Sequence, residues 1–182
     1  MILTVGSKVV YPCQGPCLVG EAIERVVAGE RRSFRHLVLL DDKGSELFVP
    51  VDRVQTIDVR PLVKRSDVPK LLDQLTKTSE MARDWKQRAD GILRLFTSGS
   101  AFDLAEVVGS LTELSNAKAL SLRESWTLAR ARKLLICEIS EVMGETKSAA
   151  EEQVDHVLRT RKIVVVSGNP DYQPVGELRH SM

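Results

Sequence analysis

The sequence is poor in the side chains that cross-link small secreted domains or build catalytic sites. It has 182 residues, of which three are cysteines, three are histidines and only 4% are aromatic. Three cysteines are too few for a disulfide framework and favour a reducing compartment. No apolar run approaches the ~18 residues of a membrane span, and residues 1–6 lack the basic start and long apolar stretch of a signal peptide. We therefore expect a soluble, cytoplasmic protein with no membrane partner.

The sequence also lacks a large net charge of either sign. The chain has 26 Lys and Arg against 25 Asp and Glu, which excludes a strongly basic coat of the histone kind. With 43% apolar and 28% charged residues, it is also too apolar for wholesale disorder. A chain of this length buries a real core either as one ordinary domain or as two small ones.

No arrangement of residues points to catalysis or metal binding. The histidines are scattered, at His36, His156 and His180. Cys13 and Cys17 stand one residue too far apart for the usual zinc knuckle and have no second pair, so ordinary strand or turn cysteines are favoured over a metal site. Residues 144–148 end like a phosphate loop but lack its earlier glycine. We expect no enzyme activity, no metal, no cofactor and no small-molecule substrate.

Residues 1–60 are typical of strands. Short runs rich in Val, Leu and Ile are separated by turn residues such as Gly15-Pro16 and Ala28-Gly29. The predicted strands are 8–12, 17–27, 33–40, 46–51 and, as an optional fifth, 54–59. Short strands with no helical pattern between them indicate a small antiparallel β-barrel or a strongly bent sheet.

From Ser66 onwards the apolar spacing is helical. Expected N-caps are Ser66, Ser100, Ser121 and Thr146. Ser121 and Glu124 form a capping box, and Gly144 is expected to end that long helix. The last helix is expected to end near Leu158, and residues 163–166 look strand-like. The sequence thus predicts an α+β protein with a β-rich module over 1–65, a compact all-helical domain over 66–162 and a tail over 163–182.

Charge is distributed unevenly within the helical half. Nine basic and six acidic side chains fall in residues 83–133, whereas one basic and six acidic side chains fall in 138–155. On the long helix the apolar stripe is Leu128, Ala131, Leu135, Ile139 and Val142. Trp126, Arg130 and Lys133 point away from it, with Arg123 alongside. An aromatic ring among cations suits contact with phosphates and bases; the alternative is a solvated face whose Trp126 packs on a neighbouring helix.

Trp85 has two interpretations. It lies on the apolar stripe of Met81, Ala89, Ile92 and Phe96, which favours a core residue. It also lies near the start of its helix among basic residues, where an exposed tryptophan can stack on or wedge against an opened base step.

Three motifs, each weak alone, occur together in a specific order. They are residues 5–12 with Gly15 and Val49-Pro50-Val51, then Asp84-Trp85-Lys86-Gln87-Arg88, then residues 120–135. This pattern resembles the CarD/CdnL family of bacterial transcription regulators, over about residues 2–160. The resemblance implies a Tudor-like, SH3-related β-module that docks on the RNA polymerase β subunit. It also implies a helical domain that contacts promoter DNA in the minor groove, without sequence specificity, at the upstream edge of the bubble.

In such proteins a tryptophan wedge stabilises the open promoter complex, and the resemblance assigns that role to Trp85. It assigns polymerase contacts to Arg25 and Val27, and Phe48 replaces an arginine of some members, so that an apolar contact is expected there. The full DNA-binding set is Trp85, Lys86, Arg88, Arg123, Trp126, Arg130, Arg132 and Lys133. Location at the nucleoid, through RNA polymerase, follows from the same resemblance.

Two alternatives stay open. The first is a protein-only adaptor in which the β-module binds a partner, the helices dimerise and both tryptophans are core or interface residues. The second concerns residues 1–60 alone, which are also similar to the polymerase-binding module of the transcription-repair coupling factor. That protein is a large motor with a full phosphate loop, which this sequence lacks.

Overall fold

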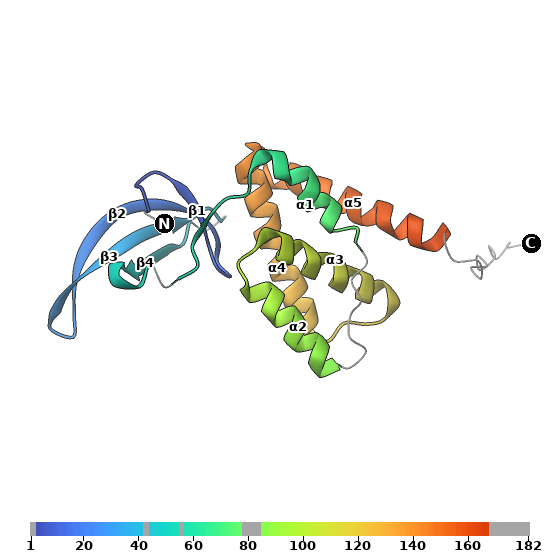
Figure 1. Cartoon of the computed structure of the whole chain (residues 1–182), viewed down its shortest axis with the longest axis horizontal. Helices are drawn as coiled ribbons and strands as arrows, with labels where there is room; N and C mark the ends of the chain where they lie inside the picture. The colour runs from blue at the N-terminus through green and yellow to red at the C-terminus, as the bar shows by residue number, and fades with distance from the viewer. Residues whose placement is uncertain (1–2, 42–43, 55–56, 78–84, 168–182) are drawn as a thin grey trace, which may run out of the picture.

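The computed structural model describes residues 3–41, 44–54, 57–77 and 85–167, and the side chains of Trp85 and of 161–167 lie outside that description. An antiparallel sheet forms one module and a group of helices forms the other, in direct contact (Figure 1). The strands are β1 (Lys8–Tyr11), β2 (Gly15–Val27), β3 (Glu30–Leu39), β4 (Glu46–Pro50) and β5 (Arg60–Pro61). The helices are α1 (Val68–Gln74), α2 (Trp85–Thr97), α3 (Ala101–Ala117), α4 (Leu122–Met143) and α5 (Lys147–Ser167). The predicted α+β fold is confirmed.

The sheet is open, so the expected β-barrel is wrong in this respect. Its strand order is β4-β3-β2-β1-β5, and every neighbouring pair is antiparallel. The long β2 changes register against β3 between Val19 and Ala22, and such an irregularity bends a strand without closing the sheet. The fifth strand is not 54–59 but the two-residue β5, because the chain first makes a short 3-10 turn at Val51–Arg53.

Each module has its own apolar core. Under the sheet, Cys17, Val19 and Leu37 are almost completely buried, and Val54, Ile57 and Val59 pack against the same cluster. The apolar residues that suggested a fifth strand therefore cover the sheet instead. In the helical module the predicted stripe of α4 is confirmed, since Ala131, Leu135 and Ile139 are fully buried against α3 and α5.

The helix ends follow the predicted capping chemistry in most places. Ser100 accepts a hydrogen bond from the Asp103 amide, the Ser121–Glu124 capping box is complete, and Gly144 ends α4 with a φ of 70°. Ser66 is not a cap: it lies inside a 3-10 turn, and α1 begins after Asp67. Residues 163–166 continue α5 as helical backbone, so the strand-like interpretation of this run is wrong.

The two modules are joined by polar and apolar contacts. Arg60 of β5 binds Glu138 of α4 through its two terminal guanidinium nitrogens, Nη1 and Nη2, at 2.7 and 2.8 Å. Glu138 Oε1 also accepts a hydrogen bond from the Val63 amide at 3.0 Å. Lys8 Nζ lies 2.7 Å from Glu141 Oε2. A Cβ placed on Gly15 would lie 2.9 Å from Leu134 Cδ2, which shows how closely the β1–β2 turn approaches α4. The sheet and the helices therefore form one body.

Among the described residues, none of the helices is both long and apolar enough to cross a bilayer.

Candidate functional site

On the sheet, the structure brings together two of the three residues expected to contact polymerase. The Arg25 guanidinium lies 3.8 Å from the centroid of the Phe48 ring, so that the β2 side chain reaches across β3 to β4. Such a cation–π contact stabilises an exposed pair by about 0.5–1 kcal/mol. Arg25 and Phe48 thus present one combined apolar and cationic surface next to the β4 edge.

His36 contributes to this surface from β3, the strand between β2 and β4. Its ring stacks on Phe48 with the centroids 5.1 Å apart and the planes 12° from parallel. The buried Nε2 atom has no hydrogen-bond partner among the described residues and lies 3.4 Å from Glu46 Oε2. The Phe48 ring therefore contacts both an imidazole and a guanidinium.

Val27 lies apart from this pair, where the β2–β3 hairpin turns. It pairs with Glu30 at the end of the ladder and is 42% exposed, and its neighbour Val26 is 68% exposed. The tip of the β2–β3 hairpin therefore has an exposed apolar surface formed by these two valines.

In the helical module, three of the cations predicted to bind DNA are engaged by other protein groups. Arg130 donates to the Cys13 carbonyl at 3.1 Å and so helps to join the modules. Arg132 is ion-paired with Glu151 and Asp155 of α5. Arg88 binds Glu124 at 3.2 Å, with 11% of its side chain exposed. Lys86 on α2 and Arg123 and Lys133 on α4 are more exposed than these three arginines.

Trp126 is exposed, as its position away from the α4 stripe predicted. Its exposed fraction is 64%, and Leu122, one turn earlier, is 89% exposed. Trp126 is therefore not a core residue. Trp85 is the first residue of α2, and its side chain lies outside the described part of the structure.

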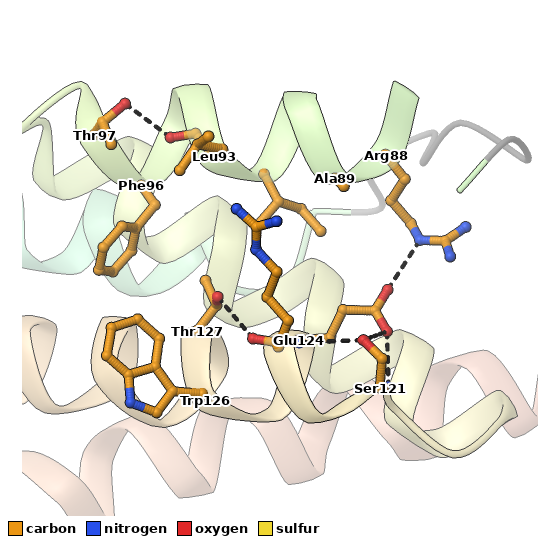
Figure 2. Close-up of a pocket in the computed structure, with 11 residues that line it drawn as sticks. Arg88, Ala89, Leu93, Phe96, Thr97, Ser121, Glu124, Trp126 and Thr127 are labelled. Carbon is orange, nitrogen blue, oxygen red and sulfur yellow. Dashed lines mark hydrogen bonds and ion pairs between the residues drawn. The ribbon is translucent and has the colours of Figure 1, made fainter. Parts of the chain in front are cut away.

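A groove of about 430 Å³ runs between α2 and the first half of α4. Its residues are Arg88, Ala89, Ile92, Leu93, Phe96, Thr97, Ser121, Arg123, Glu124, Trp126 and Thr127. We call it the α2–α4 groove. Figure 2 shows Phe96 and Trp126 at one end and the Arg88–Glu124–Ser121 interactions at the other. It is an aromatic site with an ionic end.

The charge of Glu124 is compensated within the groove. Partial burial alone would raise the pKa of its carboxyl group. Hydrogen bonds from the Ser121 hydroxyl and amide, together with the Arg88 guanidinium, outweigh burial and hold the pKa below its ordinary value. Glu124 is thus an anion that already has its counter-ion, and Arg123 adds positive charge at the groove.

Nothing in the described residues groups three or more His, Cys, Asp or Glu side chains as metal ligands. Burial raises the pKa of the Cys17 thiol to about 12, as for an inert structural cysteine. Sequence reasoning missed the Arg60–Glu138 pair and the α2–α4 groove. Both depend on residues from distant segments, for which no local pattern exists.

Comparison with known proteins adds independent findings. The family model described as "CarD-like/TRCF RID domain" matches residues 3–63, and that described as "CarD, C-terminal domain" matches residues 67–155. The chain is also 24% identical over 144 residues to a Bacillus subtilis (strain 168) protein named "Putative transcription factor YdeB". That alignment covers 79% of this chain and 94% of the relative.

Proposed function

The chain belongs to the CarD family of transcription regulators, and from this premise we propose that it docks on the β subunit of RNA polymerase with its sheet and stabilises the open promoter complex with its helical module. A family of this kind implies interaction with RNA polymerase in general. The observation that carries the proposal is the joining of an aromatic and cationic strand edge to an exposed basic helical face in one body. Such a body holds promoter DNA at a fixed place relative to the polymerase.

The polymerase contact is assigned to the outer edge of β4. Among the described residues no strand pairs with that edge, and β4 therefore has backbone groups free to accept a partner strand. Phe48 supplies an apolar anchor beside this edge, and the Arg25 guanidinium over its ring offers positive charge to an acidic partner residue. Val27 extends the contact along the hairpin.

The DNA contact is assigned to the N-terminal parts of α2 and α4. Lys86 and Arg123 are exposed there, Lys133 is exposed near the middle of α4, and these cations can neutralise phosphates, which gives weak, salt-sensitive and sequence-independent binding. Trp85, at the first position of α2, is the wedge. An inserted aromatic ring partly offsets the few kcal/mol that unstacking a base step costs, so that bases at the bubble edge re-pair more slowly. Through the polymerase the protein resides at the nucleoid.

The experiment combines open-complex lifetime with thermal unfolding. Trp85→Ala is expected to shorten the lifetime of the open complex while polymerase binding and the unfolding temperature change little, and Trp85→Phe is expected to retain part of the effect. Arg25→Glu is expected to weaken polymerase binding, and Arg159→Glu, the same charge change on α5, is its control.

Other outcomes contradict this proposal. If Trp85→Ala unfolds the helical module, Trp85 is a core residue and the wedge is lost, since truncating a core tryptophan costs about 3–5 kcal/mol. If the variant leaves both the fold and the open complex unchanged while Arg25→Glu still weakens polymerase binding, the protein is an adaptor with no direct DNA role.

A further inference from the structure

The wedge at Trp85 makes no use of the α2–α4 groove, a concavity of about 430 Å³ whose walls include apolar side chains of both helices. Leu93 is 46% exposed and Trp126 is 64% exposed on its two sides. A tryptophan on a monomer surface exposes a large apolar area to water at a free-energy cost, and it is frequently part of a binding site. The groove is therefore a candidate site in its own right.

The electrostatics of the groove favour a ligand that is both aromatic and anionic. The one acidic side chain among its lining residues, Glu124, is compensated by Arg88 at 3.2 Å. Arg123 is exposed at the same groove, and Lys86 is exposed on the adjoining turn of α2. The charged side chains that line the groove, Arg88, Arg123 and Glu124, thus carry a net positive charge, and a nucleotide unit combines the required π-face with a phosphate.

The position of the groove connects it to the proposed wedge. Ala89 lines the groove, and Trp85 stands four residues earlier on the same helix, which is one turn away on the same face. A strand that leaves the duplex beside Trp85 would therefore enter the groove at its Arg88 end and follow α2 towards Trp126, which lies beside Phe96 at the other end (Figure 2).

We propose that the α2–α4 groove receives one unpaired nucleobase of single-stranded DNA, stacked on the Trp126 indole, while Arg123 binds the adjoining phosphate. The proposal rests on the proposed function and names a second, separate contact within it. Stacking on an aromatic ring tolerates every base, because each base has a π-face. The groove therefore holds the displaced strand without reading its sequence.

The test uses the full-length chain with Trp85→Phe, so that Trp126 is the one remaining tryptophan. The probes are a ten-nucleotide oligo(dT), an abasic oligonucleotide with the same number of phosphates, and a blunt duplex. We expect oligo(dT) to quench Trp126 fluorescence and to bind about tenfold more tightly than the abasic strand, because stacking one base is worth roughly that factor or more. Equal quenching by the abasic strand would mean that the groove binds phosphate alone and would overturn the proposal.

Variants separate stacking from charge and from folding, with oligo(dT) affinity measured by anisotropy. Trp126→Leu keeps an apolar side chain but removes the π-system, and we expect it to abolish the preference for oligo(dT) over the abasic strand. Arg123→Gln is expected to lower the affinity for oligo(dT) and for the abasic strand by the same factor. Leu122→Gln removes an apolar residue that is even more exposed but lies outside the groove, and it is expected to change the affinity for neither ligand. Because Trp126 is exposed, its replacement should leave the unfolding temperature nearly unchanged.

Two further results would overturn the proposal. One is quenching by an acidic amphipathic peptide with none by oligo(dT), which would make the groove a protein-docking site. The other is an open-complex lifetime that Trp126→Leu leaves intact while Trp85→Ala shortens it; in that case the groove proposal fails and the proposed function stands. If neither variant changes the lifetime, both fail.

Discussion

Arg60 and Glu138 form a bidentate ion pair across the boundary between the two modules. Glu138 is 1% exposed and Arg60 is 24% exposed, so the pair is largely removed from water. Glu138 Oε1 also accepts the Val63 amide, and the Arg60 Nε atom donates to the Gly99 carbonyl. This ion pair thus fixes β5, the backbone at Val63 and the α2–α3 turn relative to α4.

Removing one partner of this pair should destabilise the protein strongly. Arg60→Met leaves the Glu138 carboxylate buried without its counter-ion, and we expect the free energy of unfolding to fall by about 3–5 kcal/mol. The measurement is urea unfolding of the full chain. The double variant Arg60→Met/Glu138→Met should recover most of the loss, because an apolar pair buries no charge. A double variant as unstable as the single one would contradict this account.

Gly15 offers a test of how closely the modules approach. Its φ of 102° is unfavourable for any residue with a Cβ atom, and that atom would also lie 2.9 Å from Leu134 Cδ2. Gly6 is the matched control, since its φ is 81° and an added Cβ would meet nothing within 4 Å. We expect Gly15→Ala to lower the unfolding free energy by about 1–3 kcal/mol more than Gly6→Ala, the cost of overpacking. Equal losses would mean that backbone strain alone matters.

The stability of the α4 start should depend on pH through Glu124. Its pKa is lower in the folded protein than the ordinary value of 4.5, so its ionised form favours folding. This contribution is complete above pH 4.5 and is lost as the pH falls through the folded pKa. Thermal unfolding of Glu124→Gln should therefore show a lower melting temperature at pH 7 and a smaller difference from the unaltered protein near pH 3. A constant difference over that range would contradict the linkage.

The salt dependence of DNA binding should distinguish an exposed arginine from one that is ion-paired within the protein. We expect Arg123→Gln to flatten the slope of log DNA affinity against log salt by roughly one unit or less. Arg132→Gln, the same change on the same helix, should leave the slope nearly unchanged, because Glu151 and Asp155 already hold that side chain. The measurement is fluorescence anisotropy with a labelled duplex at several salt concentrations. Equal effects of the two variants would remove the distinction between them.

Much of the fold could be predicted because its signals are local. The Ser121–Glu124 capping box, Gly144 and the apolar stripe of α4 each lie within one helix, and all three predictions are confirmed. Closure of the sheet was mispredicted, since it depends on whether β4 and β5 meet, and strand composition does not determine that. The predicted strand at 54–59 was wrong for a similar reason: strand composition does not show that Val54, Ile57 and Val59 pack against the core under the sheet instead of pairing with a strand.

The candidate site could be predicted only in part. The outward position of Trp126 followed from helical periodicity. The hydrogen bond from Arg130 to the Cys13 carbonyl could not be predicted in this way, because the two residues are 117 positions apart in the sequence. A count of cations along a helix therefore overestimates those available to phosphate. Arg25 and Phe48 were each expected to contact polymerase, but their contact with one another was not predicted, because it depends on the order of the strands in the sheet.

Because α4 is one uninterrupted helix, it fixes both the distance and the rotation angle between residues near its two ends. Trp126 and Glu138 are separated by twelve residues of this helix, or about 18 Å along its axis. Inserting one residue between them would turn the groove by about 100° around that axis, whereas inserting a whole turn would mainly move it by about 5.4 Å. The length of α4 thus sets the distance and the angle between the sheet and the α2–α4 groove, and a protein of this fold with a longer or shorter α4 would hold its groove at a different distance from its sheet.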